Sequence, residues 1–286
     1  MRFLSYTTPD GMASYGLLLD IGIVDLARRL PQAPDLQALI ATGNASMLCA
    51  GLDDAPADWQ PNEVRMLPVI PQPRTVVCVG HNYEEHRRET QRDPTEHPSI
   101  FLRTAESLQA AGEALLMPRE SDQFDYEGEL AVVIGRAGRR IAEADAWAHV
   151  FGFACFNEGS VRDWQHHSRQ FTPGKNFPRT GAFGPHLVTL DEAGPNPDLK
   201  LQTRLNGQVV QQARTSQMIF PIPEILAYVS TFITLQPGDV IATGTPGGVG
   251  AKRNPPLWMR DGDKVEIEIE GVGLLQNTVR RESAGA

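Results

Sequence analysis

The sequence predicts a mainly β protein of the α+β class. Its 26 glycines and 22 prolines favour many tight turns, and its apolar runs are short and bounded by turn residues, as is typical of strands. Hydrophobic residues make up 41% of the 286 positions, which is enough to build a core and excludes disorder as the main state. We therefore expect one large β-rich domain with a smaller appendage.

The N-terminal segment predicts three short strands followed by a helix. The strands are expected at Phe3–Tyr6, Tyr15–Leu19 and Gly22–Asp25, and the helix from Leu36 to about Ala50. Three prolines in Leu67–Arg74 fix φ and oppose regular structure. We predict a linker there, which separates a small N-terminal domain (residues 1–70) from a catalytic domain (residues 71–286).

The remainder of the chain predicts strands with few helices. The expected strands are Thr75–Gly80, Ser99–Thr104, Glu127–Gly135, Phe151–Phe156, His186–Leu190, Lys200–Gln212, Asp239–Thr245 and Lys264–Glu270. Asn206-Gly207 divides an apolar-alternating stretch, which predicts a hairpin over Leu201–Ala213. The apolar spacing after Pro223 predicts a helix with proline in its first turn.

Charge and cysteine content exclude several classes of protein. Acidic residues number 35 against 26 basic ones, and no Lys/Arg block is longer than two, so nucleic-acid binding is not expected. Three widely spaced cysteines form neither a disulfide framework nor a thiolate zinc site. No apolar run approaches the ~18 residues of a membrane span. We expect a cytoplasmic protein without membrane or nucleic-acid partners.

Two glutamates stand at the start of a strongly apolar strand. Glu127 and Glu129 flank Gly128, and the period of a strand places both carboxylates on one face. A buried carboxylate needs a partner. The pattern leaves open a solvated strand end, pairing with arginine, or metal ligation.

A third acid follows the next apolar strand. Glu158 comes directly after Phe151–Asn157, and it would face the first two glutamates if the strands were neighbours. Three converging carboxylates repel one another unless a cation neutralises them. Oxygen ligands favour Mg²⁺ or Mn²⁺ over zinc. Glu127, Glu129 and Glu158 are therefore the candidate metal ligands.

Several segments together resemble the fumarylacetoacetate hydrolase family. They are Val79–Tyr83 (VGHNY), Asp125–Leu130 (DYEGEL), Asn157–Gln165, Lys175 and Pro237–Gly250 (PGDVIATGTPGGVG). The resemblance covers about residues 70–280. It implies a mixed β-sandwich roll, an Mg²⁺ or Mn²⁺ site held by Glu127, Glu129 and Glu158, a small oxo-acid substrate and a homodimer.

Two positions depart from the family pattern. Glu158 stands where most members have Asp, and its extra methylene adds roughly 1.5 Å of reach. Lys175 matches the family's active-site lysine, but Pro178 stands where an Asp commonly follows, which leaves open what supports the position of this ammonium. The ammonium itself would still stabilise negative charge on an enolate.

His86 and Glu89 are the candidate general base and its partner. They lie three residues apart, on one face if the segment is helical, so Glu89 would orient His86 and raise its basicity. A charged surface helix is the alternative. The resemblance implies that this pair lies on a lid over the substrate, and it adds Tyr83, Arg103 and Thr245 as substrate contacts, with a surface role left open for Arg103.

We expect hydrolysis of a carbon–carbon bond in an acylpyruvate or related diketo acid. His86 with Glu89 would activate water, and Lys175 would stabilise the enolate that leaves. Two alternatives stay open. The same scaffold could decarboxylate, isomerise or hydrate a 2-oxo acid without attack by water, or the departures at Glu158 and Pro178 could mark a binding protein without turnover.

Overall fold

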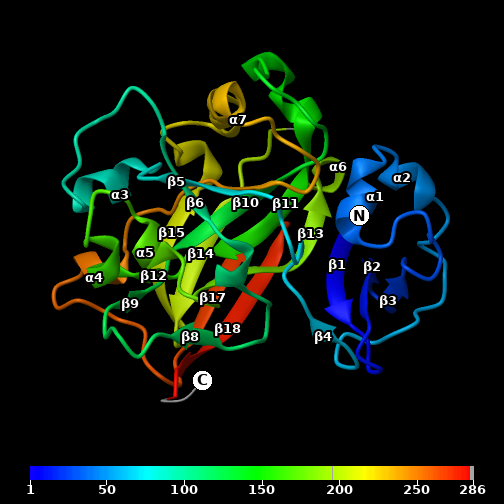
Figure 1. Ribbon diagram of the computed structural model, residues 1–286, viewed down its shortest axis with the longest axis horizontal. Coiled ribbons are helices and arrows are strands. Elements are labelled where there is room, and N and C mark those ends of the chain that lie inside the picture. The colour runs from blue at the N-terminus through cyan, green and yellow to red at the C-terminus, as the bar shows by residue number, and fades with distance from the viewer. Residues whose placement is uncertain (195, 284–286) are drawn as a thin grey trace.

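The computed structural model describes residues 1–194 and 196–283, and its fold is mainly β with short helices (Figure 1). The strands are β1 (Arg2–Thr7), β2 (Ala13–Leu19), β3 (Gly22–Asp25), β4 (Arg65–Met66), β5 (Val76–Gly80), β6 (Ser99–Arg103), β7 (Leu108–Gln109), β8 (Leu115–Met117), β9 (Phe124–Asp125), β10 (Gly128–Ile134), β11 (Val150–Asn157), β12 (Ser160–Val161), β13 (Gly181–Thr189), β14 (Lys200–Leu205), β15 (Gln208–Arg214), β16 (Val240–Ala242), β17 (Lys264–Ile269) and β18 (Gly273–Arg281). The α-helices are α1 (Leu36–Ala41), α2 (Ala45–Leu48), α3 (Glu84–Glu89), α4 (Arg162–Gln165), α5 (Thr172–Lys175), α6 (Leu190–Ala193) and α7 (Ile222–Phe232), and 3₁₀ turns cover Ala105–Ser107, Glu143–His149, Thr215–Gln217 and Gly250–Lys252. The predicted α+β, mainly β class is confirmed.

A large mixed sheet carries the strands that position the site. Its order through the described residues is β3-β2-β1-β13-β11-β10-β16-β5-β6. In the middle, β10 pairs antiparallel with β11 on one side and with β16 on the other. Every residue of β10 is buried, as its run of Leu, Ala, Val and Ile requires.

The register of this pairing explains why the acids meet. Gly128 lies opposite Asn157, so Glu127 and Glu158 lie just beyond the two paired ends. On the other edge of β10, Ala131 lies opposite Ala242 of β16. Because the two strands are antiparallel, the residues that follow β16 lie beside the start of β10. Thr243 therefore donates to the carbonyl of Leu130 through both its N–H (3.0 Å) and its hydroxyl (2.9 Å).

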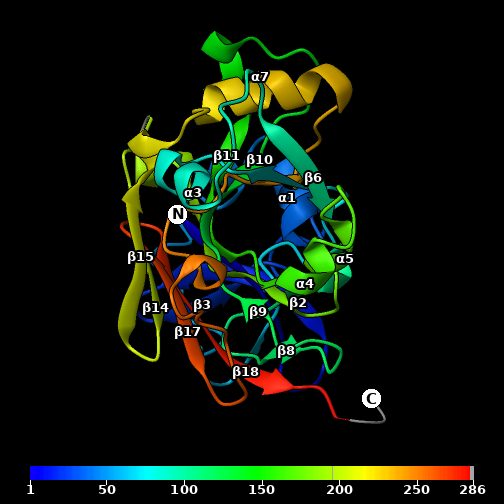
Figure 2. The ribbon, with the colours of Figure 1, turned by 90° about the vertical axis from the view of Figure 1, so that its left-hand side faces the viewer.

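A second sheet, of order β15-β14-β17-β18-β8 in the described chain, packs beside the first. Leu130 and Val132 of β10 belong to the same apolar core as Leu201 of β14 and Ile267 of β17. Helices α3, α4 and α5 lie on the side of the molecule opposite β1–β3 (Figures 1 and 2). The site helices and the N-terminal strands are thus far apart.

The hairpin and the later helix are found as predicted. Asn206 and Gly207 both have positive φ, 51° and 80°, as a two-residue turn between β14 and β15 requires. Helix α7 has a proline in its first turn. The late strand is shorter than expected, because β16 ends at Ala242 and the glycine-rich residues after it turn toward the site.

The N-terminal segment corrects two expectations. The single helix from Leu36 to Ala50 is instead α1 and α2, broken at Gly43, which has a φ of 68°. The proline-rich segment is not a free linker, because Val69 and Ile70 are buried in the core. Because β1 pairs with β13, residues 1–70 share a sheet with the rest, and the boundary near residue 70 stays a prediction.

Among the helices of the described residues, none is both long enough and apolar enough to cross a membrane.

Candidate metal and active site

The three predicted acids converge at the ends of β10 and β11. Glu127, Glu129 and Glu158 are each buried and each offers a carboxylate oxygen within 4.8 Å of the other two. Backbone contacts hold them there, because the Glu158 N–H donates to the Glu127 carbonyl (2.8 Å) and the Gly244 N–H donates to Oε2 of Glu129 (2.8 Å). The strand register, rather than the sequence spacing, places Glu158 against the other two.

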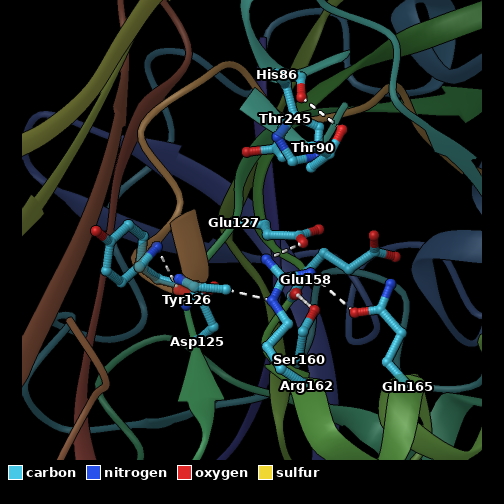
Figure 3. A network of polar contacts seen from close by, with 12 residues as sticks. His86, Thr90, Asp125, Tyr126, Glu127, Glu158, Ser160, Arg162, Gln165 and Thr245 are labelled. Atoms are coloured by element: carbon cyan, nitrogen blue, oxygen red, sulfur yellow. Dashed lines mark hydrogen bonds and ion pairs between the residues drawn. The ribbon is translucent and has the colours of Figure 1, made fainter. Parts of the chain in front are cut away.

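Two basic side chains neutralise part of this cluster. Lys175, in α5, donates from Nζ to Oε2 of Glu127 (2.8 Å) and to Oε2 of Glu158 (2.9 Å), with its side chain 3% exposed. Nη2 of Arg162, in α4, lies 2.5 Å from Oε1 of Glu127. Figure 3 shows Arg162 between Asp125, Glu127 and Gln165. The support of Lys175, which the sequence left open, comes here from two carboxylates, although Pro178 stands where the family commonly has an Asp.

These contacts divide the pKa values of the three acids. Burial opposes ionisation of Glu127, but Arg162 and Lys175 together hold its pKa well below the ordinary value. Burial and the neighbouring charges of Glu158 and Glu127 raise the pKa of Glu129 well above the ordinary value. Burial likewise raises the pKa of Glu158. Arg162 and Lys175 supply two positive charges for three carboxylates. Two of the three acids accordingly have raised pKa values.

The donor set fits a hard divalent cation. All three candidate ligands are carboxylates, which suit Mg²⁺ or Mn²⁺. Oε1 of Glu158 is buried and has no hydrogen-bond partner among the described residues. A carboxylate oxygen has more than one lone pair, so an oxygen that accepts from Lys175 can still be a ligand. Glu127, Glu129 and Glu158 are the residues that would hold the ion.

The predicted His86–Glu89 pair forms on helix α3. Nδ1 of His86 lies 2.7 Å from Oε1 of Glu89, and Oε2 of Glu89 accepts from the Gly248 N–H at 2.9 Å. The carboxylate thus ties α3 to the glycine-rich segment and fixes the imidazole, which is buried. With Nδ1 as the donor to Glu89, Nε2 is the ring nitrogen left free to exchange a proton.

One cavity of about 260 Å³ joins the acids to this pair. His86, Lys175 and Thr245 line it together with the three glutamates. The cavity wall also includes His81 and Phe171, whose rings stack with centroids 6.1 Å apart. Burial and then the charge of His86 lower the pKa of His81 to about 4, so its ring is neutral at pH 7. The His86 imidazole, the Lys175 ammonium and the three carboxylates therefore face one cavity.

The three predicted substrate contacts are placed differently. Thr245 lines the cavity, although its hydroxyl donates to the Gly128 carbonyl (3.0 Å) and accepts from Gln211 (2.8 Å). Arg103 is buried and donates to the carbonyl of Gly159 (3.0 Å), so it supports the loop that carries Glu158. Tyr83 is buried outside the cavity lining. A substrate contact from Arg103 or Tyr83 has no support in this geometry.

Some residues of the site had no role in the sequence prediction. Arg162 pairs with Asp125 (2.9 Å) and with Gln165 (2.9 Å), and Asp125 also accepts from the N–H groups of Gly250 (2.8 Å) and Ala251 (3.0 Å). Burial raises the pKa of Asp125, and Arg162 opposes this rise. In the sequence, Asp125 and Arg162 stand close to the motif glutamates, but this closeness does not show which groups pair.

Comparison with known proteins agrees with this geometry. The family model described as fumarylacetoacetate (FAA) hydrolase C-terminal matches residues 75–280. Human mitochondrial oxaloacetate tautomerase FAHD2A is 43% identical over 220 residues, 76% of this chain and 70% of the relative. Oxaloacetate tautomerase YisK of Bacillus subtilis is 41% identical over 222 residues, 76% of this chain and 74% of the relative.

Solved structures extend the similarity to the whole chain. Fumarylacetoacetate hydrolase from Exiguobacterium antarcticum has a TM-score of 0.86 and 35% identity, covering 99% of this chain and 100% of that one. Maleylpyruvate hydrolase from Sphingobium sp. SYK-6, solved with manganese(II) and pyruvate, has a TM-score of 0.82 and 27% identity with the same coverage. With this fold, this acidic cluster and this sequence match, the chain belongs to the fumarylacetoacetate hydrolase family.

Proposed function

We propose that the protein is a divalent-metal-dependent enzyme that interconverts the keto and enol forms of a small 2-oxo acid such as oxaloacetate. The observation that carries this proposal is that His86, fixed through Nδ1 by Glu89, shares one cavity with Lys175 and the three glutamates. Keto–enol exchange requires a base at carbon and stabilisation of charge at oxygen, and the cavity holds candidates for both. Curated relatives that match three quarters of the chain carry the name oxaloacetate tautomerase.

The chain's own residues divide the reaction as follows. Nε2 of His86 takes a proton from the carbon next to the keto group, and Nδ1–H keeps its bond to Glu89, which stabilises the imidazolium that forms. The ammonium of Lys175 donates a hydrogen bond to the developing enolate oxygen, and the proton held by His86 is then transferred to that oxygen, which gives the enol and returns His86 to its neutral form. The substrate loses one proton from carbon and gains one at oxygen, so no other reactant is consumed.

The implied cofactor contributes charge and orientation. Mg²⁺ or Mn²⁺ bound by Glu127, Glu129 and Glu158 would act as a Lewis acid toward the oxygens of a 2-oxo acid. Lys175 already contacts Glu127 and Glu158, so it lies where it can donate both to these acids and to a substrate beside them.

Hydrolysis of an acylpyruvate is the second candidate. The same His86–Glu89 pair could take a proton from water, and the similarity to maleylpyruvate hydrolase supports this use of the scaffold. That reaction adds one water and releases a carboxylic acid and pyruvate. It differs from tautomerisation in its products, so the two reactions are distinguishable by what they release.

The test follows both reactions with purified protein and Mn²⁺. Enol–keto conversion of oxaloacetate is followed by ultraviolet absorbance, and acetylpyruvate cleavage by coupled detection of pyruvate. We expect the first to be accelerated and to fall by about 10²–10⁴-fold in His86→Ala, the range typical of a general acid–base group. Rapid release of pyruvate from acetylpyruvate, with no acceleration of the enol–keto conversion of oxaloacetate, would contradict tautomerisation and favour hydrolysis.

A further inference from the structure

The cavity as a whole is lined by more cationic side chains than carboxylates. Four cationic side chains line it, Arg92, Arg162, Lys175 and Lys252, against three carboxylates. Arg162 and Lys175 are paired with acids at the base of the cavity. Within residues 1–194 and 196–283, neither Arg92 nor Lys252 forms an ion pair, and both are exposed.

Both unpaired cations lie on backbone that is held in place. Arg92 follows α3, where its N–H donates to the Arg87 carbonyl (3.1 Å) and its carbonyl accepts from the Arg87 guanidinium (2.5 Å). Lys252 ends the 3₁₀ turn Gly250–Lys252, whose first two N–H groups donate to Asp125. Since Asp125 also pairs with Arg162, the turn that carries Lys252 is fixed to the base of the cavity.

The charges of Arg92 and Lys252 act on one region of the cavity. His166 lines the same cavity, and its pKa is lowered by burial and then by Arg162, Lys252 and Arg92 in that order. His81 lines this cavity too, and its pKa is lowered by burial, then by the charge of His86, with a smaller contribution from Arg92. Two cations from segments about 160 residues apart in the sequence therefore line the same cavity and add positive potential to it.

We propose that Arg92 and Lys252 bind the carboxylate at the far end of the substrate and so select dicarboxylic 2-oxo acids over monocarboxylic ones. The inference rests on the proposed function, because it assumes that the 2-oxo acid end lies at the three glutamates. A dianion that enters in this orientation has one carboxylate near the metal ligands and the other toward Arg92 and Lys252, which form no ion pair among the described residues. A substrate with an uncharged far end leaves both cations solvated and gains nothing from them.

The test compares oxaloacetate with its 4-methyl ester, which has the same 2-oxo acid end and an uncharged far end. The variants are Arg92→Gln, Lys252→Gln and Lys252→Arg, and the matched control is Arg88→Gln, an exposed arginine of α3 that pairs with Glu84 and does not line the cavity. KM and kcat are measured for both substrates in Mn²⁺, and binding of both is measured by calorimetry.

We expect each Gln variant to raise KM for oxaloacetate by about tenfold, with kcat and the KM for the ester nearly unchanged. Lys252→Arg should restore the preference, and Arg88→Gln should have no effect. Equal changes for the two substrates, or none for either, would overturn the inference. If the unmodified protein turns over neither compound, the proposed function fails, and the calorimetric difference between diacid and ester still decides whether the two cations select a second carboxylate.

Discussion

Replacing Lys175 by Met tests whether the acids and the ammonium form one electrostatic unit. The ammonium lies 2.8 Å from Glu127 and 2.9 Å from Glu158, and all three side chains are almost fully buried. Removing one member of such a group leaves buried charge without compensation, which costs roughly 3–5 kcal/mol. For a chain of 286 residues, a loss of about 3 kcal/mol corresponds to about 5 °C in Tm.

A divalent cation should reverse this loss. A ligand that binds only the folded state at 100 times its Kd adds about 2.7 kcal/mol. Mn²⁺ should stabilise Lys175→Met by more than it stabilises the unmodified protein, because the variant has no ammonium at this position to repel the cation. The assay is thermal and urea unfolding at pH 8, with EDTA and with Mn²⁺.

The control for this prediction is Lys200→Met, which changes an exposed lysine at the start of β14. It should leave Tm unchanged in both conditions. If Lys175→Met is as stable as the unmodified protein in EDTA, or if Mn²⁺ stabilises both proteins equally, Lys175 is not the counter-charge of the acidic cluster.

Three further changes follow from the site. Glu89→Gln should lower kcat about 10–100-fold with little effect on KM, because His86 loses the carboxylate that stabilises its charged form; an unchanged kcat in steady-state assays would remove Glu89 from the mechanism. Mn²⁺ binding should release protons and weaken as pH falls, because the raised pKa values of Glu129 and Glu158 keep protons on ligands that must ionise. Calorimetry in buffers of different ionisation enthalpy measures the number of protons released. Binding without proton uptake by the buffer would contradict this prediction. Glu158→Asp withdraws the carboxylate by roughly 1.5 Å, so its 2.9 Å contact with Lys175 should break and unfolding in EDTA should become easier by about 1 kcal/mol; equal urea midpoints would show that the contact contributes nothing.

Local patterns predicted the local structure of the site well. Alternation placed Glu127 and Glu129 on one face of a strand, and a spacing of three placed His86 and Glu89 on one face of a helix. The turn residues Asn206-Gly207 predicted a hairpin because positive φ at both positions is required by its geometry. Each of these rests on interactions within a few residues.

The partners of Lys175 and Arg162 could not be predicted in the same way. Lys175 meets an acid 48 residues earlier in the chain, and Arg162 meets one 35 residues earlier, so the two contacts depend on how α5 and α4 pack against the segment between β9 and β10. Composition also gave no sign that the proline-rich segment at Val69 and Ile70 is buried. Proline excludes regular structure, but it does not determine whether a segment is packed.

Glu158 connects the stability of the site to its proposed cofactor. The bond from its N–H to the Glu127 carbonyl (2.8 Å) fixes the two backbones, so the extra methylene extends its carboxylate into the cluster. One oxygen meets Lys175, whereas the other is buried without a hydrogen bond among the described residues. A buried acceptor of this kind costs about 1–3 kcal/mol, and more when charged. A divalent cation bound there would remove that cost and let Glu158 ionise, so we expect the longer acid to couple metal binding to folding.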